Sequence, residues 1–237
     1  MKKFSRPLLI IDSLNLFTRH FIANPTISEN GDQVGGIVGF LKAIQLLSER
    51  FSPSGVYVVW EGGGSPRRRA IQSTYKNLKR PQKLNRFYSD DEIPDTVENR
   101  NWQIANLIKL MDKASIKQLY VSDCEADDVI GYICQEVFSD KEKIIISSDK
   151  DLYQLIGEKT VQWSPGQKKI IDAESVREKF GVYPENFCLV RSFVGDASDN
   201  LQGIKGAGFK SIVKRFPEIN ERSFLIDDLI KLAEEKN

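Results

Sequence analysis

The sequence contains few of the residues from which zinc sites and disulfide frameworks are built. One histidine, His20, and three cysteines, Cys124, Cys134 and Cys188, occur among 237 residues. The cysteines have no metal-site spacing and an odd count, so reduced, inert thiols are expected. A histidine zinc site and a histidine general base are therefore not expected, and any catalysis must rely on carboxylates, lysines or hydroxyls.

Long apolar runs are also missing from the sequence. No stretch reaches the ~20 apolar residues of a membrane-spanning helix, and the lysine-containing start lacks the long apolar core of a signal peptide. Apolar residues make up 41% and charged residues 28%, a balance typical of globular proteins. We expect a cytoplasmic protein without membrane contact, built as one domain or as a domain with a small appendage.

The formal net charge of +1 hides an uneven distribution. Between Gly62 and Ser89 there are eight basic residues and no acid, namely Arg67, Arg68, Arg69, Lys76, Lys79, Arg80, Lys83 and Arg86. Such a segment bears on the binding of a polyanion, although a merely solvated charged loop is the alternative.

Apolar runs and helical periodicity alternate along the first part of the chain. Buried strands are predicted at Leu8–Ile11 and Val56–Trp60, and further strands at Ile116–Val121 and Ile144–Ile146. Helices are predicted between them at 36–47, 101–111 and 127–138. This order predicts an α/β fold with a mostly parallel sheet flanked by helices. Sites in such sheets form beyond the carboxyl ends of the strands, and each of these four strands is followed by an acid.

Nine acidic residues at predicted strand ends, helix starts and turns are candidate metal ligands. They are Asp12, Glu61, Glu125, Asp127, Asp128, Asp149, Asp151, Asp196 and Asp199. Each one alone is compatible with helix capping or turn formation. Together they indicate metal binding, because clustered carboxylates repel unless a cation neutralises them. Oxygen-only ligands favour Mg²⁺ or Mn²⁺, and so many acids suggest two ions, as used in phosphodiester hydrolysis.

Three blocks of residues resemble the 5′ nuclease family of flap endonucleases and 5′–3′ exonucleases. They are Glu125-Ala-Asp-Asp-Val-Ile, Ser148-Asp-Lys-Asp-Leu-Tyr-Gln-Leu and the block from Gly195-Asp-Ala-Ser-Asp-Asn to Gly208. Gln162-Trp-Ser-Pro is similar to the bacteriophage members. The resemblance implies a PIN-like core over 1–184 with an arch insertion at about 62–100. A helix–three-turn–helix region would follow over 185–237.

The resemblance also implies how the acids divide between two metal ions. Asp12, Glu125, Asp127 and Asp128 would lie nearer the first ion, and Asp149, Asp151, Asp196 and Asp199 nearer the second, with Asp128 close to both. Glu61 departs from the family's aspartate at this strand end, so water-mediated contact is an alternative for it. Asp12, Asp128 and Asp149, together with Lys76, would act directly in catalysis.

The resemblance further places nucleic acid on two basic regions. Arg68, Tyr75 and Lys76 match an arch that meets a 5′ single strand, and either Lys79 or Arg80 would supply the next cation. Gly203, Gly206 and Gly208, with Lys205 and Lys210, match a turn that approaches a duplex phosphate and holds K⁺. A glycine-capped helical hairpin is the alternative for this turn.

These expectations define a metal-dependent 5′ nuclease acting on flaps, branched or nicked DNA, or RNA·DNA hybrids, in replication and repair. It would work as a monomer in a bacterial or phage-infected cytoplasm. A polymerase or a single-strand-binding protein is a conceivable partner. Two alternatives remain: a PIN-type ribonuclease, and a catalytically inactive protein that binds DNA junctions. The block from Asp196 to Gly208 argues against the first and the nearly complete acid set against the second.

Overall fold

A computed structural model describes residues 4–77, 85, 97–114 and 116–236. The chain divides into two compact units. The first comprises Met1–Gly64 with Arg80–Ser148, and the second comprises Ser65–Lys79 with Asp149–Asn237. The division predicted from the sequence, after residue 184, falls inside the second unit.

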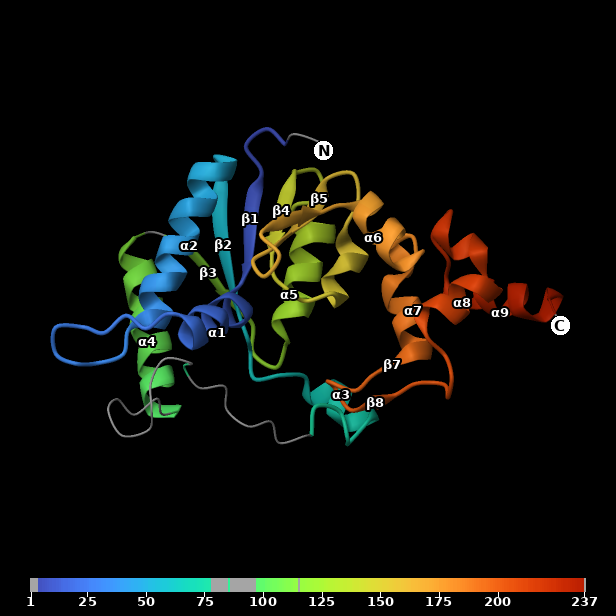
Figure 1. Cartoon of the computed structure of the whole chain (residues 1–237), viewed down its shortest axis with the longest axis horizontal. Coiled ribbons are helices and arrows are strands. Elements are labelled where there is room, and N and C mark those ends of the chain that lie inside the picture. The colour runs from blue at the N-terminus through green and yellow to red at the C-terminus, as the bar shows by residue number, and fades with distance from the viewer. Residues whose placement is uncertain (1–3, 78–84, 86–96, 115, 237) are drawn as a thin grey trace. The chain divides into compact units, whose positions relative to one another are not determined.

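The first unit contains a parallel sheet formed by the four strands predicted from the sequence. They are β1 (Leu8–Asp12), β2 (Gly55–Trp60), β3 (Lys117–Tyr120) and β4 (Lys143–Ile146), arranged in the order β3-β2-β1-β4 (Figure 1). All three pairings are parallel, with Leu9 opposite Val56 on one side and Ile144 on the other. Every residue of β1 is buried, as expected for a parallel strand covered on both faces.

Helices connect these strands, and two of them approach closely because of glycine. They are α1 (Ser13–Ala23), α2 (Gly35–Phe51), α4 (Val97–Lys113) and α5 (Ala126–Tyr132). A Cβ at Gly39 of α2 would lie 2.6 Å from Nδ1 of His20 on α1. Burial, with a smaller contribution from Arg19, lowers the pKa of His20. The only histidine therefore packs between helices as a neutral side chain.

The helix predicted over residues 127–138 forms, but its last part has a different hydrogen-bond pattern. After α5 the chain continues as a π-helix, η1 (Ile133–Val137), and the Phe138 amide donates to the Ile133 carbonyl at 2.8 Å. The wider turn rotates later residues away from the predicted apolar face. Val137 is consequently 52% exposed, although its spacing from Ile130 predicts burial.

The second unit consists of short elements. Its helices are α3 (Pro66–Ile71), η2 (Asp151–Leu155), α6 (Ala173–Phe180), η3 (Pro184–Asn186), α7 (Phe187–Val194), α8 (Phe209–Arg215), η4 (Pro217–Asn220) and α9 (Ile226–Glu235). Its strands form two antiparallel pairs, β5 (Thr160–Ser164) with β6 (Lys169–Ile171) and β7 (Gly195–Asp196) with β8 (Leu201–Gln202). Neither strand pair was predicted from the sequence.

A buried asparagine holds the C-terminal helices of this unit together. Asn186 is fully buried, and its amide nitrogen donates to the carbonyls of Ile219 and Arg222 at 2.8 and 2.7 Å. Its side-chain oxygen accepts from the amide of Phe224 at 2.8 Å. All of its polar atoms are thus paired beside the apolar cluster that contains Phe216 and Phe224.

We expect Asn186→Asp to lower the free energy of unfolding by about 3 kcal/mol, because a carboxylate oxygen would face two carbonyl oxygens in a buried position. Asn220→Asp is the matched control, since Asn220 uses only its side-chain oxygen, as the acceptor for Nε of Arg177 at 3.1 Å. Urea denaturation of both variants measures the difference. Equal stability of the two would contradict the role given to Asn186.

Cys124, Cys134 and Cys188 form no disulfide in the part of the chain that the structure describes. Burial raises the pKa of Cys134 to about 12, against a smaller opposing effect of Lys143, which makes this thiol unreactive. Within the described ranges, no helix has both the length and the apolar character required to cross a bilayer.

Candidate metal centre and nucleic-acid interface

Asp12 is held in place where β1 passes directly into α1. Its side chain is 7% exposed, and Oδ1 accepts from the amide of Asn15 at 3.2 Å, which caps the helix. Oδ2 accepts from the hydroxyl of Ser147, which follows the neighbouring strand β4, at 2.9 Å. The capping interpretation of Asp12 is therefore correct, and the same bonds orient its carboxylate at the carboxyl edge of the sheet.

Glu61 connects the end of β2 to the acidic start of α5. Its Oε2 accepts from the amide of Ala126 at 3.2 Å. Glu125 is the N-cap residue of α5 and is 3% exposed, whereas Asp127 and Asp128 occupy the first turn. Because β1 and β2 are parallel neighbours, Asp12 and Glu61 lie at the same edge of the sheet. The five ligands predicted in the first unit thus follow two strand ends and one helix start.

The other four predicted ligands belong to the second unit. Oδ1 of Asp149 accepts from the amide of Asp151 at 2.9 Å, and Oδ1 of Asp196 accepts from the amide of Ser198 at 2.7 Å. Both side chains therefore also form the turns expected of them. Nε of Arg191 lies 3.3 Å from Oδ1 of Asp151, and its Nη2 contacts Oδ2 of Asp196, so that one guanidinium joins two carboxylates.

The carboxylates of this unit influence one another. Burial raises the pKa of Asp151; Arg191 opposes this effect, and Asp149, Asp196 and Asp199 add to it. Burial would also raise the pKa of Asp196, but the hydrogen bonds from Ser198 and the charge of Arg191 outweigh it and lower that pKa. Arg191 therefore supplies positive charge to a cluster that would otherwise repel itself.

We expect Arg191→Leu to lower the free energy of unfolding by about 1–2 kcal/mol at pH 7, because it leaves Asp151 and Asp196 without their shared cation. The pKa of Asp196 is lower in the folded protein than in the unfolded chain. The stability lost through Asp196 should therefore be fully seen at a pH above the unfolded-state pKa of this carboxyl. It should disappear as the pH falls through its folded-state pKa. Arg177→Leu, which removes an exposed arginine bonded to Asn220, is the control.

Thermal unfolding with and without a divalent cation provides the measurement. The cation should raise the melting temperature of the Arg191→Leu variant more than that of the wild type, because the freed carboxylates can bind it. An equal rise in both proteins would show that Asp151 and Asp196 are not cation ligands.

The geometry does not by itself assemble a metal site. Among the residues that the structure describes, no set of three or more histidine, cysteine, aspartate or glutamate side chains lies close enough to hold an ion. The nine ligand assignments accordingly stay predictions. Several of these carboxylates are instead oriented by protein donors: Ser147 for Asp12, the Ala126 amide for Glu61, and Arg191 for Asp196.

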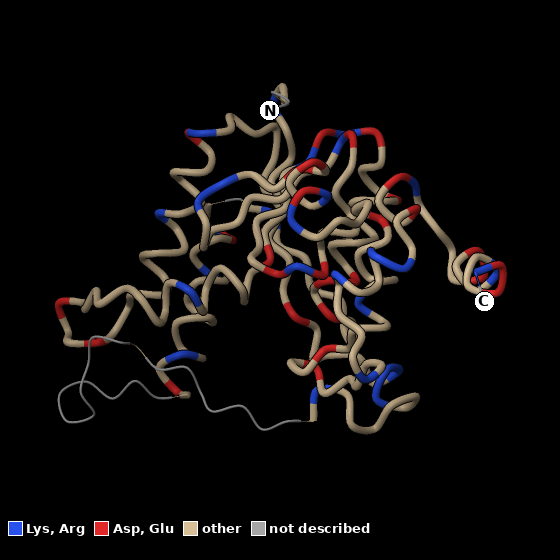
Figure 2. Tube along the Cα trace, turned by 45° about the vertical axis from the view of Figure 1, so that its right-hand side comes forward, with Lys and Arg blue, Asp and Glu red and all other residues tan. Residues whose placement is uncertain are grey.

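Only some of the residues predicted to contact nucleic acid lie in the part of the chain that the structure describes. Arg68 is exposed on α3, whose N-cap Ser65 accepts from its amide at 3.2 Å, and Tyr75 is 7% exposed. Lys79 and Arg80 lie outside the described residues. Charges of both signs are interspersed along the described trace (Figure 2).

Lys76 is attached to the acidic turn that follows β7. Its amide donates to the carbonyl of Asp199 at 3.0 Å, and its Nζ lies 3.9 Å from Oδ2 of the same residue. The side-chain amide of Asn200 donates to the carbonyl of Thr74 at 3.1 Å. Figure 1 shows α3 beside β7 and β8 in this unit. The predicted catalytic lysine and a predicted ligand are thus held together.

The glycine turn between β8 and α8 uses its glycines for different purposes. A Cβ at Gly203 would lie 2.2 Å from the carbonyl oxygen of Val194, so this glycine is required by internal packing. Gly206 has φ +81°, which favours glycine, and open space surrounds it. Gly208 is the N-cap residue of α8. Lys205 and Lys210 are exposed, as a nucleic-acid contact requires.

Three residues of the site escaped the sequence analysis. Ser147 and Asn200 adjoin acidic blocks, and their position beside a predicted ligand is the only sequence signal for them. Arg191 lies five residues before Asp196, near the end of α7. A basic residue one turn before an acidic block is a weak signal, because many exposed helices have it.

Comparisons with known proteins show which family the sequence matches. The sequence model of the 5′-3′ exonuclease N-terminal resolvase-like domain matches residues 7–181. A 5′-3′ exonuclease of Aquifex aeolicus is 31% identical over 210 residues, which cover 88% of this chain and 68% of that protein. One from Buchnera aphidicola is 29% identical over 220 residues, covering 90% and 72%.

A solved structure resembles the chain over almost its full length. A bacteriophage T5 flap endonuclease, in a pseudo-enzyme-product complex with DNA and metal ions, superposes with a TM-score of 0.71. The similarity covers 94% of this chain and 78% of that one, at 20% sequence identity. At this identity the likeness establishes the α/β fold with its mostly parallel sheet.

Proposed function

Because the chain belongs to the 5′-3′ exonuclease family, which by sequence and fold includes flap endonucleases, we propose that it is a structure-specific 5′ nuclease. It would hydrolyse phosphodiesters near the 5′ ends of branched DNA or of RNA·DNA hybrids. Shape and ends of the nucleic acid, rather than base edges, would select the substrate.

One observation carries this proposal beyond family membership. Asp12 and Glu61 end adjacent parallel strands, and Glu61 accepts a hydrogen bond from the first residue of α5, the helix that carries Asp127 and Asp128. Acids at the carboxyl edge of an α/β sheet are positioned where ligands bind in such folds. The fold therefore places carboxylates at the strand ends where a ligand is expected to bind.

The donor set fits a hard divalent ion. All nine proposed ligands are carboxylates, and oxygen-only donors favour Mg²⁺ or Mn²⁺ over zinc. Asp151 and Asp196 already share one cationic group, Arg191, which shows that this pair can converge on positive charge. When bound, two such ions supply the water activation and charge neutralisation of phosphodiester hydrolysis.

The chain's own residues would hold the substrate. Lys76 is positioned by Asp199 and exposed, so its amine can leave this carboxylate for a phosphate oxygen of the strand to be cut. Arg68 would contact the backbone of the 5′ strand. Lys205 and Lys210 beside the glycine turn would hold the duplex, and K⁺ is proposed for the same turn.

Cleavage of a 5′-labelled flap and of a matched RNA·DNA hybrid, with Mg²⁺ and with EDTA, tests the proposal. Short 5′ products should form only with Mg²⁺ and should disappear in Asp149→Ala. The control is Asp227→Ala, which removes an exposed carboxylate from the first turn of α9. Tight, metal-independent flap binding without cleavage of either substrate would replace the nuclease by a junction-binding protein.

A further inference from the structure

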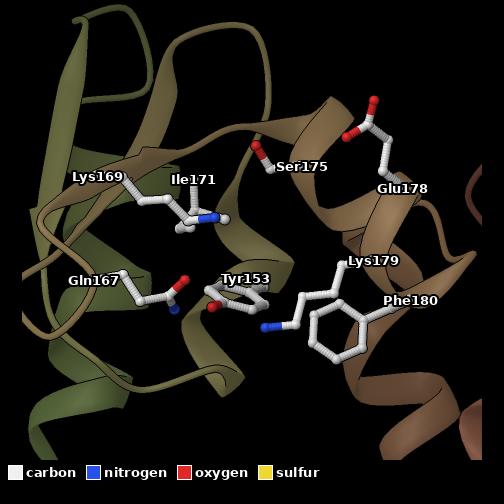
Figure 3. A pocket seen from close by; sticks show the side chains of 8 residues that line it. All are labelled: Tyr153, Gln167, Lys169, Ile171, Ser175, Glu178, Lys179 and Phe180. Atoms are coloured by element: carbon white, nitrogen blue, oxygen red, sulfur yellow. The ribbon is translucent and has the colours of Figure 1, made fainter.

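A cavity of about 230 Å³ lies within the second unit, and the residues that line it include none of the carboxylates assigned to the metal centre. It is bounded by η2, the β5–β6 hairpin and α6 (Figure 3). The lining residues used in the argument are Tyr153, Gln167, Lys169, Lys179 and Phe180. Its volume is below the roughly 300–1,000 Å³ typical of sites for drug-sized ligands, which suits a small group such as a phosphate inside the cavity.

Four polar side-chain groups line this cavity. Figure 3 shows the amines of Lys169 and Lys179 and the side-chain amide of Gln167 directed toward Tyr153, whereas the carboxylate of Glu178 points away. In the described part of the chain, neither amine forms a salt bridge, and neither the side-chain amide of Gln167 nor the hydroxyl of Tyr153 forms a hydrogen bond.

The position of Tyr153 in the cavity wall indicates a ligand. Its side chain is only 3% exposed, with its ring packed edge-on against Phe187 at 5.2 Å between centroids. The phenol of Tyr153 faces the cavity, where its hydroxyl can donate to a bound acceptor.

The chemistry of the lining identifies the class of ligand. Two amines, an amide and a hydroxyl can together donate to one group with several acceptor oxygens, and a phosphate has that character. The ring of Phe180, with Nζ of Lys179 5.4 Å from its centroid, provides an apolar wall on which a base or sugar can pack.

We propose that this cavity binds a phosphorylated nucleotide, with its phosphate at Lys169 and Lys179 and its base or sugar against Phe180. The phosphate follows from the cavity alone, whereas the choice of a nucleotide rests on the proposed function. The nucleotide is either a free 5′-mononucleotide or the 5′-terminal nucleotide of a strand. In both cases it is bound outside the cleavage site.

Isothermal titration calorimetry in EDTA tests the site without cleavage. The probes are deoxyadenosine 5′-monophosphate, a 5′-phosphorylated tetranucleotide and inorganic phosphate. The double variant Lys169→Met/Lys179→Met should weaken nucleotide binding by at least about tenfold, because it removes two charge-assisted contacts. Tyr153→Phe, which keeps the ring in its aromatic cluster, should weaken it by about fivefold. Lys168→Met, which removes an exposed amine that does not line the cavity, should change nothing.

The probes distinguish the two sources of the nucleotide. Binding of the mononucleotide assigns the site to free nucleotide, and binding of the tetranucleotide alone assigns it to a strand end. Equal affinity for inorganic phosphate would overturn the nucleotide assignment. Binding that is unchanged in all the variants would overturn the site itself.

Failure of this inference can be separated from failure of the proposed function. Normal flap cleavage by a protein that binds none of the probes would refute the cavity site alone. Nucleotide binding that depends on Lys169 and Lys179, in a protein that cleaves nothing, would refute the nuclease and leave the site standing.

Discussion

Asp12→Asn is expected to cleave 5′ flaps about a thousandfold more slowly than the wild type, because a metal ligand supplies several kcal/mol of transition-state stabilisation. The fold should be retained. Asparagine caps helices as well as aspartate does, so the bond from the Asn15 amide can remain. The side-chain amide can likewise face the Ser147 hydroxyl, which then accepts instead of donating. Charge is thus lost with little change in shape.

Single-turnover cleavage with Mg²⁺, together with thermal unfolding, measures both parts of this expectation. Asp123→Asn is the matched control, because it removes the same charge from an exposed position in the same unit, two residues before Glu125. A melting temperature near that of the wild type would show that activity, and not folding, is lost. If Asp12→Asn kept more than about a tenth of the rate, Asp12 would serve only to cap α1.

Gly62→Ala is expected to lower the free energy of unfolding by at least about 3 kcal/mol. A Cβ at this position would lie 1.8 Å from the carbonyl oxygen of Val121 and 2.7 Å from that of Cys124. Two backbone hydrogen bonds hold Gly62 against this segment: its amide donates to the carbonyl of Cys124, and its carbonyl accepts from the amide of Asp123. Relief of the overlap must separate the chain after Glu61 from the chain before Glu125, so cleavage should fall as well.

Gly131→Ala, in the same unit, is expected to raise the free energy of unfolding instead of lowering it. Gly131 lies in α5, and no atom outside its own helix approaches within 4 Å of a Cβ built there. Alanine should therefore stabilise the protein by up to about 1 kcal/mol through helix propensity alone. Chemical denaturation of both variants makes the comparison. Similar stabilities for Gly62→Ala and Gly131→Ala would contradict the close approach at Gly62.

Much of the first unit follows from local sequence pattern. Apolar runs predict β1, β2 and most of β4, because a strand covered on both faces is largely apolar. The third predicted strand forms as β3, but it is polar in part and its end residues are exposed. The acids after these runs predict where a site forms, since parallel strands end at a shared edge. The motif blocks also carry the family resemblance, which the match over residues 7–181 confirms.

Only the tertiary structure decided how the individual side chains are paired. Arg191 joins Asp196 to Asp151, which lies 40 positions before Arg191 in the sequence, and Asn200 donates to the carbonyl of Thr74. No local periodicity encodes such contacts, because they depend on which turns meet once the helices have packed. The π-turn that exposes Val137 and the cavity beside Tyr153 have the same origin. The sequence by itself therefore determined the four parallel strands of the first unit, the positions of the acids after them and the family. Contacts between residues far apart in the sequence decided the partners of each charge and the antiparallel strand pairs of the second unit.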